Sequence, residues 1–213
     1  MAIKENIIKA LQDIRKQSAE SPRKFKQSVD LIINLREIDL KKNPINVLVD
    51  LDHRVKDKKI AAFLEKKTKI VDTIAKSEFD AFKDKKKMKK LIKEYDFFIA
   101  HAKLMPAVAT DFGRVLGPAG KMPSPQLGVL IGAEDDDNIK QLVDRINSVV
   151  KIKPKEPSIK VAIGNEVDKD ENLADNATSI YNEVFKLLPE GRENVRSVMI
   201  KFTMSKPVKV SLT

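Results

Sequence analysis

Apolar residues recur along this chain with two different periods, which predict two kinds of element. Recurrence every third or fourth position is typical of an amphipathic helix. Ile3, Ile7, Leu11 and Ile14 form such a stripe near the N-terminus. By this criterion we expect helices over residues 2–17, 77–93, 104–115, 139–150 and 172–188, the second of them capped by Ser77.

Strict alternation of apolar and polar residues predicts strands with one buried face and one solvent-exposed face. In the first predicted strand every second residue from Val29 to Leu35 is apolar. Counting back in steps of two, which we call parity, places Phe25 on the same face. In the last predicted strand, parity places Met204 on the apolar face with Phe202. The expected strands cover residues 24–36, 45–51, 97–100, 159–163 and 197–205, with short apolar runs at 60–64 and 70–74.

The order of these elements divides the chain. Strands alternate with helices in the middle third, which favours an α/β layer with some parallel pairing, whereas the two ends are typical of an α+β domain. The simplest account is one domain inserted into another, with crossings near residues 62 and 154. We expect residues 1–62 and 154–213 to form domain one and residues 63–153 to form domain two. Two crossings between small domains predict a hinge.

The charge balance points to an anionic partner. The 213 residues include 41 basic and 31 acidic side chains, a formal net charge of +10. Nucleic acid is the leading candidate, ahead of a membrane surface, although a lysine-coated protein without such a partner would show the same balance. The lysine run over residues 85–90 is interpreted as a solvated helix face and only secondarily as a phosphate contact.

Several classes of protein are excluded or disfavoured by composition. The sequence has no cysteine, so disulfides and zinc–thiolate sites are excluded. The N-terminus lacks the apolar core of a signal peptide, and the longest apolar stretch, residues 97–109, is too short to span a bilayer. We therefore expect a cytoplasmic protein without membrane contact. We also expect the protein to be monomeric when free.

Glycine and proline are concentrated in residues 113–125, which read GRVLGPAGKMPSP. Such a segment is expected to be a loop with a specified, non-repetitive path, and its cations suit a phosphate-bearing partner. The spacing fails the P-loop pattern, because Val115 stands where the first glycine belongs and Met122 follows Lys121. The candidate residues of this basic loop are Arg114, Gly117, Gly120 and Lys121.

The wet faces of the first and last predicted strands carry cations and hydroxyls. Such groups bond phosphate oxygens and ribose hydroxyls, and the ribose hydroxyl distinguishes RNA from DNA. An ordinary solvated sheet face would show the same pattern. Phe25, between two lysines, could stack on a base, although its parity favours the core. The candidate RNA-binding residues on these faces are Lys24, Lys26, Ser28, Asp30, Ser197, Lys201 and Thr203.

No catalytic or metal-binding constellation emerges from the sequence. Asp50 and Asp52 near a strand end suggest an aspartate nucleophile of phosphoryl transfer, but no threonine follows at the expected spacing. His53 and His101 have no neighbours at metal-ligand spacing. The aspartates at 135–137 suit the N-terminus of a helix. We expect no enzymatic activity, no metal and no cofactor.

Three segments resemble the ribosomal protein L-one family: VLGPAGKMPSP at 115–125, SVMIKFTM at 197–204 and the RKF at 23–25. The resemblance covers essentially the whole chain and is nearest in length to archaeal-type members. It implies binding to the stalk region of large-subunit ribosomal RNA near the tRNA exit site. It also implies help in releasing deacylated tRNA and, for many members, repression of the protein's own messenger RNA. The alternative is a basic nucleic-acid-binding or ribosome-associated factor with no fixed RNA target.

The resemblance also implies a fold and a set of contacts. The fold is an α+β discontinuous domain, a split antiparallel sheet with helices, carrying an inserted α/β Rossmann-like three-layer domain. A turn at Ser205–Pro207 would reconcile Met204 with exposure, and Ser205 stands where the family has a glycine after Thr-Met. The family's Pro-Arg-Gly reads Pro118–Gly120 here, and its Leu-Pro-His-Gly reads Leu51–Arg54. The family's RNA-contacting positions correspond to Lys24, Phe25, Asp30, Ser197, Thr203 and Met204.

Overall fold

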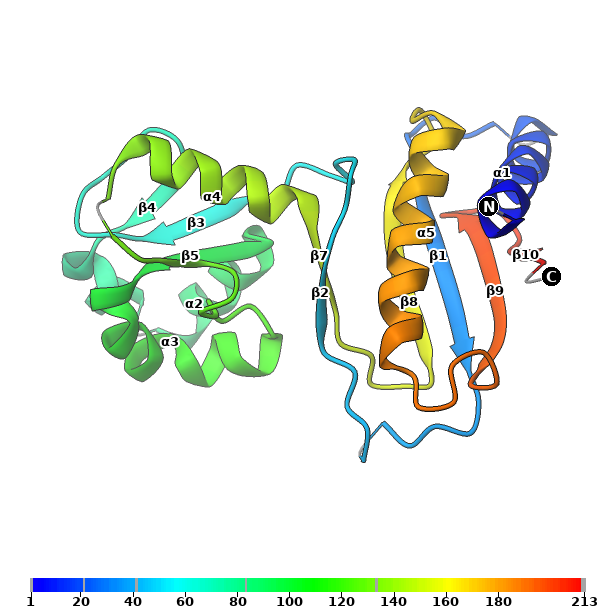
Figure 1. Ribbon diagram of the computed structural model, residues 1–213. Coiled ribbons are helices and arrows are strands. Elements are labelled where there is room, and N and C mark those ends of the chain that lie inside the picture. Colours follow the sequence, from blue (N-terminus) through cyan, green and yellow to red (C-terminus); the bar gives the residue numbers. More distant parts are fainter. Residues whose placement is uncertain (1, 21, 41, 83, 133, 212–213) are drawn as a thin grey trace. The chain divides into compact units, whose positions relative to one another are not determined.

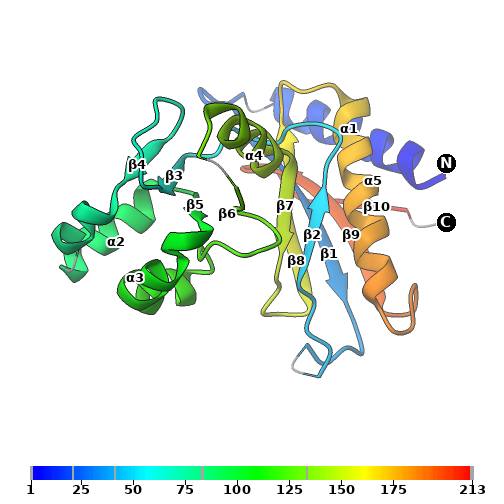
Figure 2. The ribbon, with the colours of Figure 1, turned by 60° about the vertical axis from the view of Figure 1, so that its left-hand side comes forward.

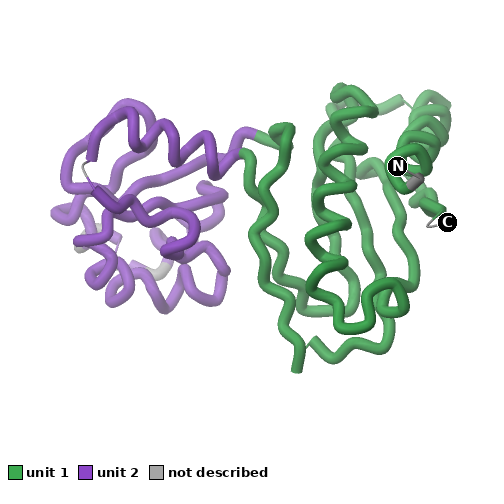
Figure 3. Tube along the Cα trace, viewed as in Figure 1, with its two compact units in different colours: residues 1–56, 148–213 green, residues 57–147 purple. Residues whose placement is uncertain are grey.

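The computed structural model describes residues 2–20, 22–40, 42–82, 84–132 and 134–211. It divides into two compact units, and Figure 3 colours unit 1 (residues 1–56 and 148–213) and unit 2 (residues 57–147) separately. The boundaries fall at 56/57 and 147/148, whereas the sequence suggested crossings near 62 and 154. The difference follows from strand pairing. Residues 60–63 pair only with strands of unit 2, and residues 149–152 pair with a strand of unit 1.

Unit 1 is an antiparallel sheet with two helices on one face (Figure 1). The four-stranded sheet has the order β10-β9-β1-β8, and β2 and β7 form a separate antiparallel pair. The elements are α1 (Ala2–Glu20), β1 (Ser28–Leu35), β2 (Val47–Asp50), β7 (Val149–Ile152), β8 (Ser158–Asn165), α5 (Asp170–Leu187), β9 (Val195–Phe202) and β10 (Val208–Val210).

The core of unit 1 lies between that sheet and its two helices. Along β1, buried and half-buried residues alternate, and the buried set from Val29 to Leu35 joins the core as the sequence pattern predicts. The apolar stripe of α1, which includes Ile7, Leu11 and Ile14, packs into the same core. The alternate residues of β1 and β9 are therefore left on the face that the helices do not cover.

The ends of β1 and β9 contradict the sequence prediction. β1 begins at Ser28 rather than Lys24, and β9 ends at Phe202, so Phe25 and Met204 lie outside the strands. The side chain of Phe25 is 52 % exposed and that of Met204 is 56 % exposed, where parity placed both in the core. The cause is the end of the pairing at Val29 and Phe202, because parity applies only where the ladder continues.

Unit 2 is built on a parallel sheet with the order β4-β3-β5-β6. Figures 1 and 2 show α2 and α3 on one face of this sheet and α4 on the other. The elements are β3 (Ile60–Phe63), β4 (Asp72–Ile74), η1 (Lys76–Phe82), α2 (Lys85–Glu94), β5 (Phe97–His101), η2 (Ala102–Leu104), α3 (Met105–Ala119), β6 (Val129–Leu130) and α4 (Asp136–Ser148).

Aromatic rings fill the core between this sheet and α3. Phe63 of β3 stacks on Phe98 of β5 with ring centroids 5.8 Å apart, and it packs against Phe112 of α3 at 5.0 Å. Phe79 of η1 meets Phe63 and Phe112 edge to face. Offset and edge-to-face pairs of this kind add stability beyond the area they bury.

The glycine- and proline-rich segment is helical over its first half, which corrects the expected loop. α3 continues through Gly113, Gly117 and Pro118 and ends at Ala119. Gly120 then takes the left-handed conformation with φ of 70°, and its N–H donates to the carbonyl of Gly117. The N–H of Lys121 donates to the carbonyl of Leu116 at 3.1 Å. This is a glycine C-cap, so the segment specifies where a helix ends.

Three other predicted boundaries are wrong. The expected helix over 77–93 is divided into η1 and α2, and α2 is capped by Asp84, whose Oδ1 accepts the N–H of Lys86 at 3.0 Å. Ser77 lies inside η1 and is not the cap. Val149 and Val150 belong to β7 rather than to the preceding helix, because they pair with β2.

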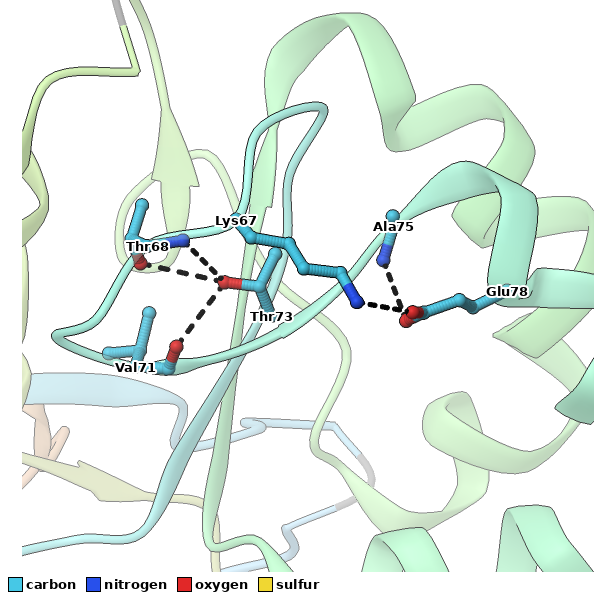
Figure 4. A network of polar contacts seen from close by, with 6 residues as sticks. All are labelled: Lys67, Thr68, Val71, Thr73, Ala75 and Glu78. Carbon is cyan, nitrogen blue, oxygen red and sulfur yellow. Dashed lines mark hydrogen bonds and ion pairs between the residues drawn. The ribbon is translucent and has the colours of Figure 1, made fainter.

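The loop between β3 and β4 is closed by polar contacts (Figure 4). The hydroxyl of Thr73 accepts the N–H of Thr68 at 3.3 Å and donates to the carbonyl of Val71. Lys67 Nζ lies 2.7 Å from Glu78 Oε1, and this bond lowers the pKa of the Glu78 carboxyl. The ammonium of Lys67 is therefore used within the fold.

Candidate nucleic-acid interface

The segments before β1 and after β9 are joined side by side at one end of the unit 1 sheet. The N–H of Ser28 donates to Thr203 Oγ1 at 3.1 Å, and the N–H of Thr203 donates to the carbonyl of Ser28 at 3.1 Å. The exposed hydroxyl of Thr203 also donates to the Ser28 carbonyl at 3.4 Å, which leaves a second lone pair on its oxygen for a partner. Two candidate residues separated by 175 positions in the sequence therefore form one local structure.

Gln27, which the sequence interpretation missed, is a buried residue that supports the contact between Ser28 and Thr203, called here the Ser28–Thr203 junction. Its side chain is 2 % exposed. Its Oε1 accepts the N–H of Met204 at 3.1 Å, and its Nε2 donates to Ser18 Oγ at 3.2 Å. Its carbonyl accepts the N–H of Glu166 at 2.9 Å. The sequence does contain a sign of this role. Gln27 lies two residues before Val29, so alternation places this polar residue on the buried face of the strand.

Phe25 precedes β1 and Met204 follows β9, and both present exposed apolar side chains. Each is more than half exposed, and the backbone N–H of Met204 is held by the side chain of Gln27. Residues of this kind are suited to stack on or pack against bases and riboses. The exposure of Phe25 and Met204 agrees with the RNA contacts that the family resemblance implies. It disagrees with the alternation of the strands, which placed both side chains in the core.

A depression of about 360 Å³ opens beside the junction. Gln27 forms part of its wall, together with the end of α1 and the turn after β9. The lining residues are Gln17, Ser18, Glu20, Arg23, Gln27, Met204, Ser205 and Lys206. Within the described residues, neither Lys24, Lys26 nor Lys206 is held in an ion pair, and all three are exposed, so their ammonium groups can meet phosphates.

Ser205 closes the turn after β9 with its side chain. Its Oγ accepts the N–H of Phe202 at 2.8 Å, and its own N–H donates to the Phe202 carbonyl at 3.1 Å. The turn therefore forms without the glycine that the resemblance leads us to expect at this position. The half-buried hydroxyl is engaged, so Ser205 shapes the path of Met204 more than it offers a free donor.

Asp30 and Lys201 face each other across β1 and β9 on the face that the helices do not cover. Burial raises the pKa of the Asp30 carboxyl, and the positive charge of Lys201 acts in the opposite direction. A carboxylate that is kept half-buried beside one cation is a strong acceptor for a hydroxyl or amino group.

Ser197 lies on the same face but away from the junction. It stands six residues before Thr203 in the sequence, which is about 20 Å along an extended chain. Its hydroxyl accepts from Asn34 Nδ2 at 3.0 Å, and Asn34 Oδ1 in turn accepts from Ser158 Oγ at 2.9 Å. The structure thus brings most candidates together at one end of the sheet and leaves Ser197 in a separate polar row.

The residues of the predicted basic loop belong to unit 2 and have different surroundings. Arg114 and Gly117 lie within α3, and Gly120 caps it. Lys121 Nζ donates to the carbonyls of Ile92 and Tyr95, each at 2.7 Å. These carbonyls end α2, where a cation is favoured by the helix dipole. Lys121 therefore holds two helices of unit 2 together.

The histidines have structural partners. Asn176 exchanges hydrogen bonds with the backbone of His53. His101 is buried, and its Nε2 lies 2.9 Å from the Gly132 carbonyl. Across the described ranges, no three acidic or histidine side chains converge on a potential metal position. In that same part of the chain, no helix is long and apolar enough to cross a membrane.

Comparison with known proteins decides the family. The family model described as "Ribosomal protein L1p/L10e family" matches residues 14–206. The chain belongs to this family. It is 38 % identical to the large ribosomal subunit protein uL1 of Methanothermococcus thermolithotrophicus, over 97 % of this chain and 98 % of that protein. It is 40 % identical to uL1 of Pyrobaculum neutrophilum over 88 % and 86 %, and 35 % identical to uL1 of Pyrococcus horikoshii over 97 % and 96 %.

Family membership confirms two of the expectations. The resemblance seen in the three sequence segments is correct, and it extends over most of the chain. The family is one of structural, non-enzymatic proteins, so the expectation that the chain is not an enzyme is also confirmed.

Proposed function

We propose that this chain is a structural component of the large ribosomal subunit and binds the stalk region of large-subunit ribosomal RNA through unit 1. Family membership and the name that the relatives share, large ribosomal subunit protein, support the subunit. The observation that carries the binding site is the Ser28–Thr203 junction, where hydroxyls, cations and exposed apolar side chains meet on firmly held backbone.

The proposed contacts divide by chemistry. Lys24, Lys26 and Lys201 neutralise phosphates and position the RNA without reading its sequence. Thr203 and Asp30 form hydrogen bonds with ribose hydroxyls or base edges. These contacts depend on the shape and chemistry of the RNA. The remaining proposed contacts are the apolar pair Phe25 and Met204, the hydroxyls of Ser28 and Ser197, and the turn residue Ser205.

We further propose that unit 2 is a Rossmann-like three-layer domain inserted into a discontinuous α+β domain. The support is the parallel order β4-β3-β5-β6 with helices on both faces of that sheet. Crossings at 56/57 and 147/148 would then act as a hinge. Arg114, on the surface of unit 2, stays a candidate phosphate contact, together with the backbone at Gly117 and Gly120. Lys121 is assigned to the fold.

The resemblance extends the proposal to other partners. These are exit-site tRNA, whose release in the deacylated form the protein would assist, and its own messenger RNA, which it would repress through a similar RNA fold. The chain would then be cytoplasmic and ribosome-associated, and monomeric when free.

Competition binding at two salt concentrations tests the main proposal. Labelled stalk ribosomal RNA is challenged with unlabelled stalk RNA and with scrambled RNA of equal length. A preference for the stalk RNA that persists at the higher salt supports a shape-specific interface. Equal competition that weakens together with salt would instead favour the alternative, a basic factor with no fixed RNA target.

A further inference from the structure

One surface of unit 2 is strongly cationic and has no role in the fold described so far. α2 buries Met88 and Leu91 against the unit 2 core and exposes lysines on its remaining surface. Lys86, Lys90 and Lys93 follow one another at spacings of four and three residues, which places them in a single row about 10 Å long on one side of a helix. The exposed lysines of α2 are Lys86, Lys87, Lys89, Lys90 and Lys93.

This arrangement opposes the rules that stabilise an isolated helix. Lys86 and Lys87 lie in the first turn, where the helix dipole disfavours positive charge. The pairs Lys86–Lys90 and Lys89–Lys93 set like charges at the spacing of direct neighbours. A helix that needed only solubility would alternate charges of opposite sign. Asp84 caps this helix and Lys93 suits its last turn, but no described carboxylate pairs with the exposed lysines, so a functional surface is the expected reason for the like-charge pairs.

Other lysines of unit 2 show what a structural role looks like. Lys121 donates to the end of α2, Lys67 pairs with Glu78, and Lys58 Nζ donates to the carbonyl of Ile146. Burial lowers the pKa of the Lys58 ammonium, as expected for a group held inside the fold. The exposed lysines of α2 named above differ from these, because none of them makes a side-chain hydrogen bond or ion pair with any described residue.

The chemistry of the row indicates the class of partner. Ammonium groups are point charges that meet phosphates, and no aromatic side chain is exposed in the described part of unit 2 to stack on a base. An interfacial membrane helix needs a free apolar face, and the apolar face of α2 is already buried. We propose that this lysine row is a second RNA-binding surface, which contacts the phosphate backbone without reading sequence. The inference rests on the proposed function only for the choice of RNA as the anion.

The test compares two triple variants with equal reduction of charge. K86Q/K90Q/K93Q removes the row, and K59Q/K103Q/K140Q removes three exposed lysines elsewhere on unit 2. Binding of single-stranded homopolymer RNA, which needs no cognate site, is measured over a range of salt concentrations. For the row variant we expect the slope of log K against log salt to become shallower by about 2, because each phosphate that is no longer neutralised reduces it by about 0.7. The control variant should change it by less than half as much.

Two further measurements complete the design. The preference of the row variant for stalk RNA over scrambled RNA should equal that of the unmodified protein, because phosphate contacts carry no sequence information. Equal slopes for the two triple variants would overturn the proposal, and so would binding of phosphatidylserine vesicles that depends on the row while homopolymer binding does not. If the unmodified protein itself shows no preference for stalk RNA, the proposal for unit 1 fails. The salt slopes of the two triple variants still decide whether the lysine row binds RNA.

Discussion

The side chain of Gln27 holds the backbone of Met204 in place through a hydrogen bond of 3.1 Å between Oε1 and the Met204 N–H. One residue of this pair is buried and the other is exposed. A buried polar group thus fixes the path of a turn whose side chain faces solvent, which is the arrangement needed to present an apolar side chain to RNA at a defined position.

Replacement of Gln27 by methionine should weaken both the fold and the interface. The change keeps the volume but leaves the Met204 N–H and the Ser18 hydroxyl without this partner, and we expect a decrease of about 1–3 kcal/mol in the free energy of unfolding. Urea denaturation measures it, with the exposed Gln12→Met as the control. Stalk RNA affinity should fall as well, whereas an unchanged denaturation midpoint would show that Gln27 is dispensable.

Thr203→Val should reduce the affinity for stalk RNA by on the order of 1–3 kcal/mol, because a polar group of the RNA would be left unpaired at the contact. Part of the effect could arise within the protein, since Thr203 Oγ1 also accepts the Ser28 N–H. The free energy of unfolding is therefore measured beside the binding constant. Thr203→Ser retains the hydroxyl and should restore most of the affinity. Equal affinity of the valine variant and the unmodified protein would remove Thr203 from the site.

Asp30→Asn should stabilise the protein at neutral pH. Burial raises the pKa of the Asp30 carboxyl above its ordinary value of 3.8, so the folded state holds the proton more tightly than the unfolded state does. Such a carboxyl stabilises the folded state below pH 3.8. This stabilisation is lost as the pH rises through the higher pKa of the folded state. The variant's advantage in urea denaturation should therefore be present at pH 7 and vanish below pH 3.8. If Asp30 is a contact, affinity for stalk RNA should fall although stability rises.

The pattern of the sequence predicts unit 1 well where strands have neighbours on both sides. β1 pairs with β8 and β9 along its length, so alternation correctly assigns Val29 to Leu35. It fails for Phe25 and Met204, because strand pairing ends before these two residues. The direction of Met204 is set by the local bond between Phe202 and Ser205 and by the long-range bond from Gln27, whose partner the local pattern does not reveal.

In unit 2 the glycines and prolines of residues 113–125 predict a loop where the structure has the end of a helix. Gly117 and Pro118 lie in the last turn of α3, where the missing proline N–H costs a single hydrogen bond and the chain is about to leave the helix. Gly120 alone of the glycines in residues 113–125 takes a positive φ. The glycines and prolines of this segment therefore do mark a specified structure, which is the end of a helix with its C-cap.

Lys121→Met should destabilise the protein without changing its preference among RNAs. The ammonium group donates to the carbonyls of Ile92 and Tyr95, which would be left without this partner at the end of α2. Bonds to a charged group are worth about 1.5–3 kcal/mol each, and relaxation around the half-buried stem should keep the decrease in unfolding free energy near that of one bond. Thermal and urea denaturation measure it, with the exposed Lys103→Met as the matched control. A variant of normal stability that binds RNA less tightly would return Lys121 to the phosphate contacts.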